Sequence, residues 1–116
     1  EEGNVGGLNW FEADVCRFNM KDKLRFKIPH TGWNQILKQK ENKILTGLND
    51  GDEFYFLHSY FVKPLNHDIV LTTTSYEQEF VSSIHRDNIW GVQFHPEKSH
   101  SKGDRLLSNF ITLTHV

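Results

Sequence analysis

The chain has 116 residues and a formal net charge of −2 at pH 7, with 13 Lys and Arg against 15 Asp and Glu. This length is enough for one domain, and 37% apolar residues exclude a disordered tail. The near-neutral charge argues against a nucleic-acid partner, and apolar runs of only a few residues argue against a membrane span. A single cysteine, Cys16, cannot form an internal disulfide, which favours a reducing, cytoplasmic compartment.

The apolar pattern predicts a β-rich chain that ends in one helix. Residues 42–48 are expected to form one or two helical turns, and residues 54–59 form a nearly continuous apolar run, typical of a strand buried on both faces. Residues 69–76, 79–85 and 89–94 predict a β-meander, because polar turns separate them. Further strands are expected at residues 14–18, 23–28 and 35–37.

The last segment changes to a helical period. Leu106, Leu107, Phe110 and Ile111 form one apolar stripe, and Ser101 with Asp104 is a candidate capping pair before it. One helix covers little of a sheet of this size, and the chain begins with Glu1 rather than Met. We therefore expect an α/β domain of which an N-terminal part precedes this chain.

The sharpest local feature is the sequence Gly-Val-Gln-Phe-His-Pro-Glu at residues 91–97. His95 and Glu97 are two residues apart, so on an extended backbone their side chains leave the same side. A carboxylate there accepts a proton from one imidazole nitrogen and fixes the tautomer, which frees the other nitrogen to act as a base. A solvated or structural pair is the alternative interpretation.

Metal chemistry has little support in this sequence. The zinc deaminase pattern needs a later Pro-Cys-x-x-Cys, a His-Glu-x-x-His helix is absent, and the seven histidines are scattered. We expect no metal and no cofactor.

A catalytic His-Glu pair implies a nucleophile, and Cys16 is a poor candidate for it. A nucleophile on a strand-to-helix elbow needs flanking glycines, whereas Cys16 lies between Val15 and Arg17 in a strand pattern. A free cysteine in such a pattern is usually a small buried hydrophobic residue. If His95 is a base, its nucleophile is expected outside this sequence.

Three blocks in order resemble one family. They are residues 28–34 (Ile-Pro-His-Thr-Gly-Trp-Asn), residues 54–60 (Phe-Tyr-Phe-Leu-His-Ser-Tyr), and residues 91–99 followed by Gly103, Leu106, Leu107, Asn109 and Phe110. Together they resemble the glutaminase subunits of imidazole glycerol phosphate synthase, which are class I glutamine amidotransferases. The resemblance covers essentially the whole chain. It implies that residues 1–116 are the C-terminal, β-rich portion of a flavodoxin-like α/β domain whose catalytic Cys lies in a preceding part.

The resemblance also implies a function and a set of site residues. Such enzymes hydrolyse glutamine to glutamate and ammonia through a Cys-His-Glu triad, and deliver ammonia to a synthase (cyclase) subunit in a heterodimer that serves histidine biosynthesis. By resemblance His95 is the general base and acid and Glu97 orients it. Glu2, or Glu1 with a slip of one residue, matches a position that holds the substrate's amino group, and Ser59 matches one that contacts its α-carboxylate through the backbone. The oxyanion-hole donors fall outside the chain.

Three further positions match the family's edge that faces the synthase. Trp33, Asn34 and Lys98 are expected at this partner interface, because an exposed Trp with polar neighbours suits an interface anchor. The alternative for Trp33 is partial burial under the sheet. His30 and His58 are expected to be structural, hydrogen-bonded histidines.

Alternatives to the histidine pathway remain open. Lys98-Ser99-His100, followed by a basic residue and Gly103, resembles relatives that feed amino-sugar synthesis for surface polysaccharides with a different partner. A non-catalytic binding or regulatory module on the same fold is a second alternative. The chain by itself is expected to be inactive, because it lacks the nucleophile.

Overall fold

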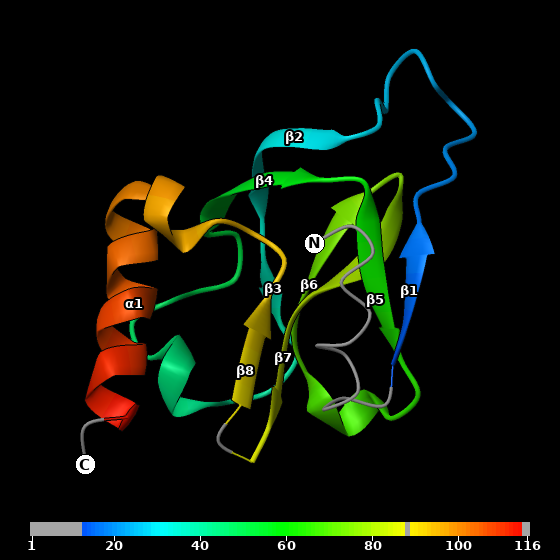
Figure 1. Cartoon of the computed structure of the whole chain (residues 1–116). Helices are drawn as coiled ribbons and strands as arrows, with labels where there is room; N and C mark the ends of the chain where they lie inside the picture. The colour runs from blue at the N-terminus through cyan, green and yellow to red at the C-terminus, as the bar shows by residue number, and fades with distance from the viewer. Residues whose placement is uncertain (1–12, 88, 115–116) are drawn as a thin grey trace.

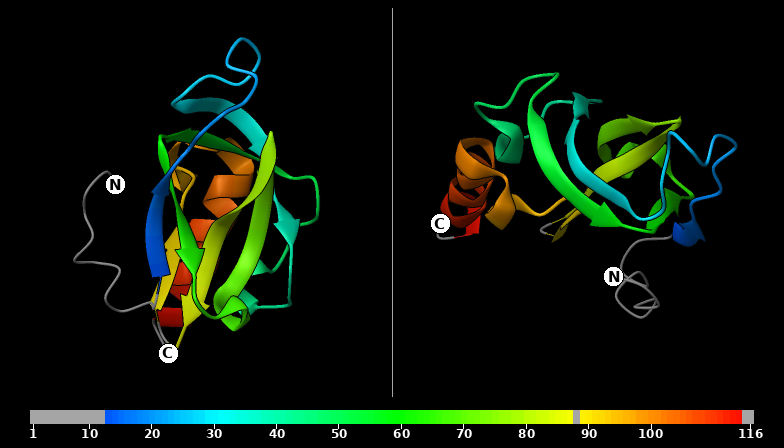
Figure 2. Two further views of the ribbon diagram at one scale, coloured as in Figure 1. Left: turned by 90° about the vertical axis from the view of Figure 1, so that its right-hand side faces the viewer. Right: turned by 90° about the horizontal axis from the view of Figure 1, so that it is seen from above.

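The computed structural model describes residues 13–87 and 89–114, and the statements on structure below concern these residues. They form a mixed α/β structure that is rich in strands and ends in one helix, α1 (His100–Thr114). Figure 1 shows α1 beside β8 (Ile89–Val92), and Figure 2 shows α1 and β1 (Ala13–Arg17) at opposite ends of the molecule. The β-rich composition and the C-terminal helix are as predicted.

Two antiparallel sheets make up the body. The larger has the order β1-β5-β7-β6-β3, where the further strands are β5 (Tyr60–Pro64), β7 (Gln78–Arg86), β6 (Val70–Tyr76) and β3 (Leu37–Lys38); β8 also pairs with β7. The smaller consists of β2 (His30–Gln35) and β4 (Glu53–His58). The predicted meander is confirmed, because β6, β7 and β8 pair in sequence order.

The core lies between the two sheets and α1. Its residues are apolar and include five phenylalanines, of which Phe54 and Phe56 of β4 are fully buried. Phe94 packs against both rings, and Leu106 of α1 closes the cluster at the helix end. The larger set of buried members is Phe18, Met20, Ile36, Ile44, Leu45, Leu48, Leu71 and Phe80.

Residues 23–28 do not form the predicted strand. They form turns and bends, with Leu24 88% exposed and the backbone N–H of Phe26 bonded to the Asp22 carbonyl. The Asp22 carboxylate also accepts the N–H of Arg25, which closes a local turn. Side-chain alternation alone did not make a strand here, because local turn bonds satisfy the backbone.

Other predictions need smaller corrections. The predicted strand at 35–37 is divided, because Gln35 ends β2 and Leu37 starts β3 around a fully buried Ile36. The expected helical turns at 42–48 are a single 3₁₀ turn, η2 (Lys43–Leu45), capped by the Asn42 side chain. α1 begins at His100, so Ser101 lies inside its first turn and the predicted capping pair is wrong.

β4 is not buried on both faces as the apolar run predicted. Phe54, Phe56 and His58 are buried, whereas Leu57 is exposed and Tyr55 is half-buried. β4 lies in a two-stranded sheet and covers the core with one face only. The fully buried run is found instead in β6, where five successive residues from Val70 are buried.

Candidate active site at the His95–Glu97 turn

The catalytic pair predicted from the sequence lies just after β8, where Phe94 anchors the chain in the core. His95 keeps an extended backbone, and a 3₁₀ turn, η4 (Pro96–Lys98), follows at once. Proline suits the first position of such a turn, because its missing N–H is not needed there. His95 and Glu97 therefore meet across a tight turn, not along a straight strand as the sequence argument assumed.

The two side chains form a hydrogen-bonded pair at the surface. Nδ1 of His95 lies 3.0 Å from Oε2 of Glu97, and their side chains are 36% and 59% exposed. The backbone N–H of Glu97 and then the His95 side chain lower the pKa of the Glu97 carboxyl. The carboxylate is thus ionised near neutral pH and accepts the Nδ1 proton, which leaves Nε2 with its lone pair available for a reacting group.

The backbone of His95 is held by three hydrogen bonds. Its N–H donates to the Tyr55 carbonyl at 2.8 Å, and its carbonyl accepts from the Lys98 N–H at 3.0 Å and from the Ser99 hydroxyl at 2.6 Å. Ser99 is 2% exposed, and its oxygen also accepts the Tyr55 N–H at 2.9 Å. The turn is therefore bonded to both main-chain polar groups of Tyr55 in β4.

Helix α1 packs closely on this turn because Gly103 has no side chain. A β-carbon there would lie 1.9 Å from the Pro96 carbonyl oxygen and 2.9 Å from Cβ of Ser99. The Gly103 N–H instead donates to the Ser99 carbonyl at 3.3 Å. Gly103 is part of the family resemblance, but the Pro-x-x-Ser-x-x-x-Gly spacing by itself does not predict this contact.

Next to this turn lies a buried pair of histidines, His30 and His58. Nδ1 of His30 lies 2.9 Å from Nε2 of His58, and Nδ1 of His58 lies 2.8 Å from the Tyr60 carbonyl. Because a carbonyl only accepts, His58 donates from Nδ1 and accepts at Nε2 from His30, whose Nε2 then accepts from the Asn34 amide at 3.2 Å. The structural, hydrogen-bonded role expected for both histidines matches this arrangement.

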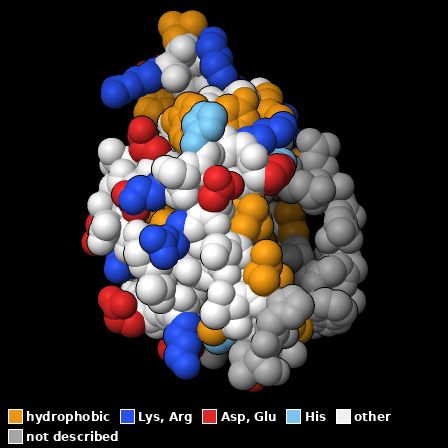
Figure 3. All heavy atoms as spheres, turned by 90° about the vertical axis from the view of Figure 1, so that its left-hand side faces the viewer, with side chains coloured by type: hydrophobic (Ala, Val, Ile, Leu, Met, Phe, Trp, Pro, Cys, Tyr) orange, Lys and Arg blue, Asp and Glu red, His pale blue; other side chains and the backbone are white. Residues whose placement is uncertain are grey.

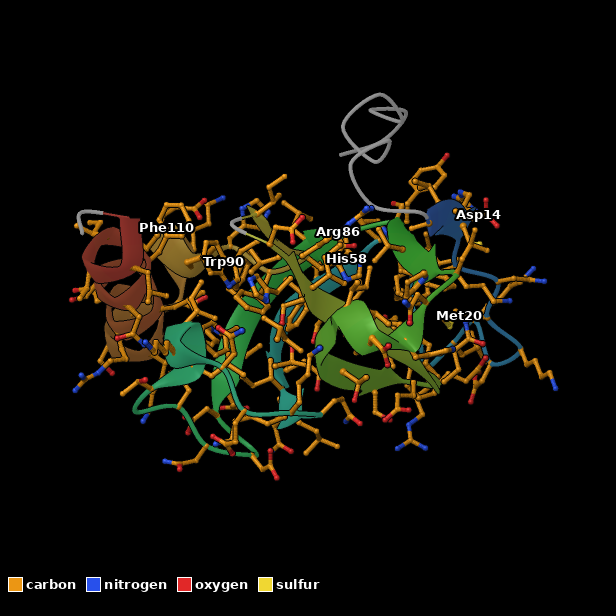
Figure 4. All side chains as sticks on the ribbon, turned by 90° about the horizontal axis from the view of Figure 1, so that it is seen from below. Asp14, Met20, His58, Arg86, Trp90 and Phe110 are labelled. Carbon is orange, nitrogen blue, oxygen red and sulfur yellow. The ribbon has the colours of Figure 1, made fainter. Side chains whose placement is uncertain are left out.

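Burial keeps both imidazoles neutral. Desolvation, followed by the charge of His58, lowers the pKa of His30 to about 4. Desolvation is also the main cause that lowers the pKa of His58; the bond to Tyr60 opposes this, and the charge of His95 adds to it. The ring of His30 stacks between Tyr76 and Phe56, at centroid distances of 4.0 and 4.9 Å. Figure 4 shows His58 among the strands, away from the outer surface.

The predicted substrate-binding residues are only partly described. Ser59 is half-buried between β4 and β5, and its carbonyl accepts the Phe18 N–H at 3.0 Å. The bond from His58 to the Tyr60 carbonyl spans Ser59 and fixes this corner. Glu2, like Glu1, lies outside the described residues. Cys16 is half-buried in β1 opposite Phe61, as expected for a residue in an ordinary strand.

Of the predicted interface residues, Trp33 and Lys98 lie together and Asn34 does not. Trp33 is 44% exposed, meets the ring of Tyr55 edge-on, and Lys98 lies over that ring at 6.0 Å. His100, which was not predicted at this surface, stacks on Trp33 at a centroid distance of 5.2 Å. Figure 3 shows a histidine among hydrophobic side chains at the upper end of the helix face.

Asn34 is engaged inside the fold. Its amide nitrogen donates to the Ser75 carbonyl at 2.8 Å as well as to His30, and its oxygen accepts the Gln35 N–H at 2.7 Å. An interface role for Asn34 would thus require it to leave these bonds. Neighbouring positions in a strand face opposite sides, which is why Trp33 and Asn34 separate.

Two other classes of site are absent from the described residues. Within residues 13–87 and 89–114, no three His, Cys, Asp or Glu side chains gather where they could hold a metal ion. In the same part of the chain, no helix has the length and hydropathy needed to cross a membrane.

Comparison with known proteins gives one consistent result. The sequence model of the family "Glutamine amidotransferase class-I" matches residues 9–113. "Imidazole glycerol phosphate synthase subunit HisH 2" of Pseudomonas aeruginosa is 46% identical over 97% of this chain and 55% of its own length. The protein of the same name in Methanococcus maripaludis is 47% identical over 96% and 54%, and subunit HisH of Aquifex aeolicus is 49% identical over 95% and 51%.

A solved structure supports the fold. It is described as that of a GMP synthase subunit from Thermoplasma acidophilum, and aligns with a TM-score of 0.68 and 22% identity over 87% of this chain and 48% of that one. The chain spans about half the length of the curated relatives it matches. With a family match over nearly all of its residues and relatives at 46–49% identity, the chain belongs to the class-I glutamine amidotransferases.

Proposed function

We propose that the protein containing this chain is a glutaminase, which hydrolyses glutamine to glutamate and ammonia and passes the ammonia to a synthase partner. The observation that carries this proposal is the His95–Glu97 hydrogen bond within a class-I glutamine amidotransferase. The names of the relatives favour a partner that forms imidazole glycerol phosphate, in histidine biosynthesis. A reducing, cytoplasmic location agrees with a chain that has one cysteine.

In the proposed reaction His95 moves protons and Glu97 keeps it oriented. Nε2 takes the proton of a cysteine thiol, the sulfur attacks the side-chain amide carbon of glutamine, and the proton passes to the departing nitrogen, so that ammonia leaves and a thioester remains. His95 then takes a proton from water, which attacks the thioester and releases glutamate and the thiol. Glutamine and water are consumed, and glutamate and ammonia are formed.

We further propose that the cysteine belongs to a part of the domain outside these 116 residues. Cys16 lies in a regular strand without flanking glycines, which is unsuited to a nucleophile elbow. The outer edge of β8 has no strand partner among the described residues. Val92 of β8 and Phe110, which meets Trp90 of β8, expose apolar surface there. Figure 3 shows a band of hydrophobic side chains on the face of the molecule that carries the helix, and Figure 4 shows Phe110 facing Trp90. A preceding segment that extends the sheet would cover this band.

Substrate and partner contacts follow by resemblance. Glu2 and Ser59 are proposed to hold the amino and carboxylate groups of glutamine. Trp33 and Lys98, together with Tyr55 and His100, are proposed as a docking surface for the synthase. Their exposure and mutual stacking support this role, because aromatic and cationic side chains that are already ordered lose little entropy on binding.

A substitution of His95 tests the chemistry. His95→Ala in the full-length protein is expected to abolish glutaminase activity while circular dichroism stays unchanged, because the His95 side chain is partly exposed and its backbone bonds remain. His67→Ala is the matched control, since His67 lies exposed in a distant turn. Wild-type turnover in His95→Ala would refute the assignment of His95 as the base, and a full-length wild-type protein without glutaminase activity would favour the binding module. The 116-residue chain alone should release no ammonia. Ammonia release from it would refute the proposal that the catalytic cysteine lies outside these residues.

The identity of the acceptor is tested by the partner. Full-length protein is mixed with a purified cyclase of imidazole glycerol phosphate synthase or with an amino-sugar synthetase, and ammonia release is measured. The expected result is acceleration by the cyclase. The second candidate, amino-sugar synthesis, is favoured by the Lys98-Ser99-His100 sequence, whose histidine stacks on Trp33 in the proposed docking surface. Acceleration only by the synthetase would establish it.

A further inference from the structure

We propose that Ser99 is a positioning residue for His95: its buried hydroxyl joins the His95 carbonyl to the backbone of β4 and thereby keeps the imidazole directed for proton transfer. This inference rests on the proposed function, because it assigns Ser99 to the same site. Ser99 does not touch the reacting atoms, so its effect passes through the backbone of His95.

The geometry around the hydroxyl supports this assignment. The Ser99 hydroxyl donates to the His95 carbonyl at 2.6 Å and accepts from the Tyr55 N–H at 2.9 Å. With the His95 N–H bonded to the Tyr55 carbonyl at 2.8 Å, both peptide groups next to the His95 Cα are tied to one residue of β4. Fixing both peptide planes fixes the direction of the Cα–Cβ bond, from which the imidazole projects.

An ordinary capping role does not account for these bonds. Ser99 directly precedes α1, where a serine side chain usually accepts an N–H from the first helical turn. In the described part of the chain the hydroxyl bonds instead run to His95 and across to Tyr55. The hydroxyl therefore serves the turn and β4, and not the start of the helix.

The side chain of Ser99 has no freedom to make other bonds. It is 2% exposed, and its Cβ lies on the side of α1 where Gly103 leaves room. The Gly103 N–H donates to the Ser99 carbonyl, and the Ser99 N–H donates to the Pro96 carbonyl at 3.0 Å. Because the backbone of Ser99 is fixed on both sides, its hydroxyl holds the His95 carbonyl at a fixed position relative to β4.

The consequence for the reaction is a selective effect on turnover. An imidazole that swings away from its productive direction lowers the rate of proton transfer, and a displacement of about 1 Å costs up to about 100-fold. Binding of glutamine is proposed to rely on other residues, so KM should change little. The His95–Glu97 bond should also weaken, since its 3.0 Å geometry depends on where the turn holds the ring.

The test compares Ser99→Ala, Ser99→Cys and the control Ser101→Ala in the full-length protein with its partner. Ser101 is an exposed serine two residues further on, so its variant should match the wild type. Ser99→Ala should lower kcat by about 10- to 100-fold with KM within about twofold. Ser99→Cys, which keeps the shape but forms weaker hydrogen bonds, should fall between wild type and Ser99→Ala.

A second readout does not depend on turnover. The ¹⁵N chemical shifts of the neutral His95 imidazole report which nitrogen carries the proton, and the wild type should show Nδ1–H because Nδ1 bonds to Glu97. Ser99→Ala should shift this toward a mixture with the Nε2–H tautomer, whereas a purely structural role would leave the tautomer unchanged. All measurements are made below the unfolding temperature of the least stable variant.

The outcomes separate the two proposals. Loss of kcat together with a changed tautomer supports the role of Ser99. Unchanged kcat and tautomer in both Ser99 variants overturns it. Wild-type protein without glutaminase activity would refute the proposed function, and the tautomer would still decide on Ser99. If Ser99→Ala does not fold, Ser99→Cys decides by the same two readouts.

Discussion

Replacing Gly103 by alanine should destabilise the protein, although helix propensity alone predicts the opposite. In the interior of an exposed helix the change from glycine to alanine stabilises by about 1 kcal/mol. Here the new β-carbon would lie 1.9 Å from the Pro96 carbonyl oxygen, about 1.5 Å short of ordinary contact. The neighbouring atoms belong to the backbone and to a buried Cβ, so none of them can rotate away.

The magnitude follows from these two opposing effects. One extra carbon in a packed site typically costs about 1–3 kcal/mol, and a rigid backbone contact lies at the upper end of that range. Net of helix propensity, the free energy of unfolding should fall by about 2 kcal/mol. Because the turn that must move carries His95, kcat of the full-length enzyme should fall as well.

Denaturant unfolding and glutaminase kinetics of full-length Gly103→Ala measure both effects. Ser108→Ala is the matched control: it lies on an exposed position of the same helix and should gain about 0.5 kcal/mol without a contact. A Gly103→Ala protein as stable as Ser108→Ala, with wild-type kcat, would show that the helix does not need the close approach to the turn.

Three further predictions concern other parts of the chain. Stability should fall as pH drops from 6.5 to about 4, since the unfolded state then binds a proton that His30, with its pKa of about 4, does not. The loss amounts to about 3 kcal/mol in unfolding experiments, and His30→Gln should flatten that dependence; an equally steep profile in the variant would contradict it. Glu97→Gln should lower kcat by about 10²–10⁴-fold and leave circular dichroism unchanged, and a wild-type rate would remove Glu97 from the mechanism. Trp33→Ala should weaken binding of the synthase partner at least about 30-fold in a titration, whereas Leu24→Ala, exposed on a distant loop, should not; equal affinities would place the partner elsewhere.

Elements whose ends are marked by nearby residues were predicted well from the sequence. The meander from β6 to β8 and the stripe of α1 were predictable because polar turns and period changes mark them. Residues 23–28 also alternate, yet they form turns, since the Asp22 side chain and carbonyl bind the following N–H groups. Alternation shows which side chains share a face, but whether a partner strand exists depends on distant residues.

In the site, too, contacts between residues close in the sequence were predictable, whereas contacts between distant residues were not. The His95–Glu97 pair is separated by one residue, so the sequence contains it directly. Ser99 and Tyr55 are 44 residues apart, and His30 and His58 are 28 apart. The His30–His58 contact depends on the register of β2 and β4, in which His30 lies opposite His58. The Ser99–Tyr55 contact depends on how the turn after β8 packs against β4. No local pattern encodes the register of β2 and β4. The only hint in the sequence is that both of these segments contain a histidine.

A single strand, β4, connects the parts of this site. At Tyr55 both main-chain groups point away from β2 and bond to the His95–Ser99 turn, while three residues later His58 bonds to His30 and braces the Ser59 corner. Side chains alternate along a strand, so Phe54 and Phe56, on either side of Tyr55, anchor β4 in the core. The proposed base and the proposed carboxylate contact thus share one rigid support. A shift of β4 would move both together, which preserves their relative geometry.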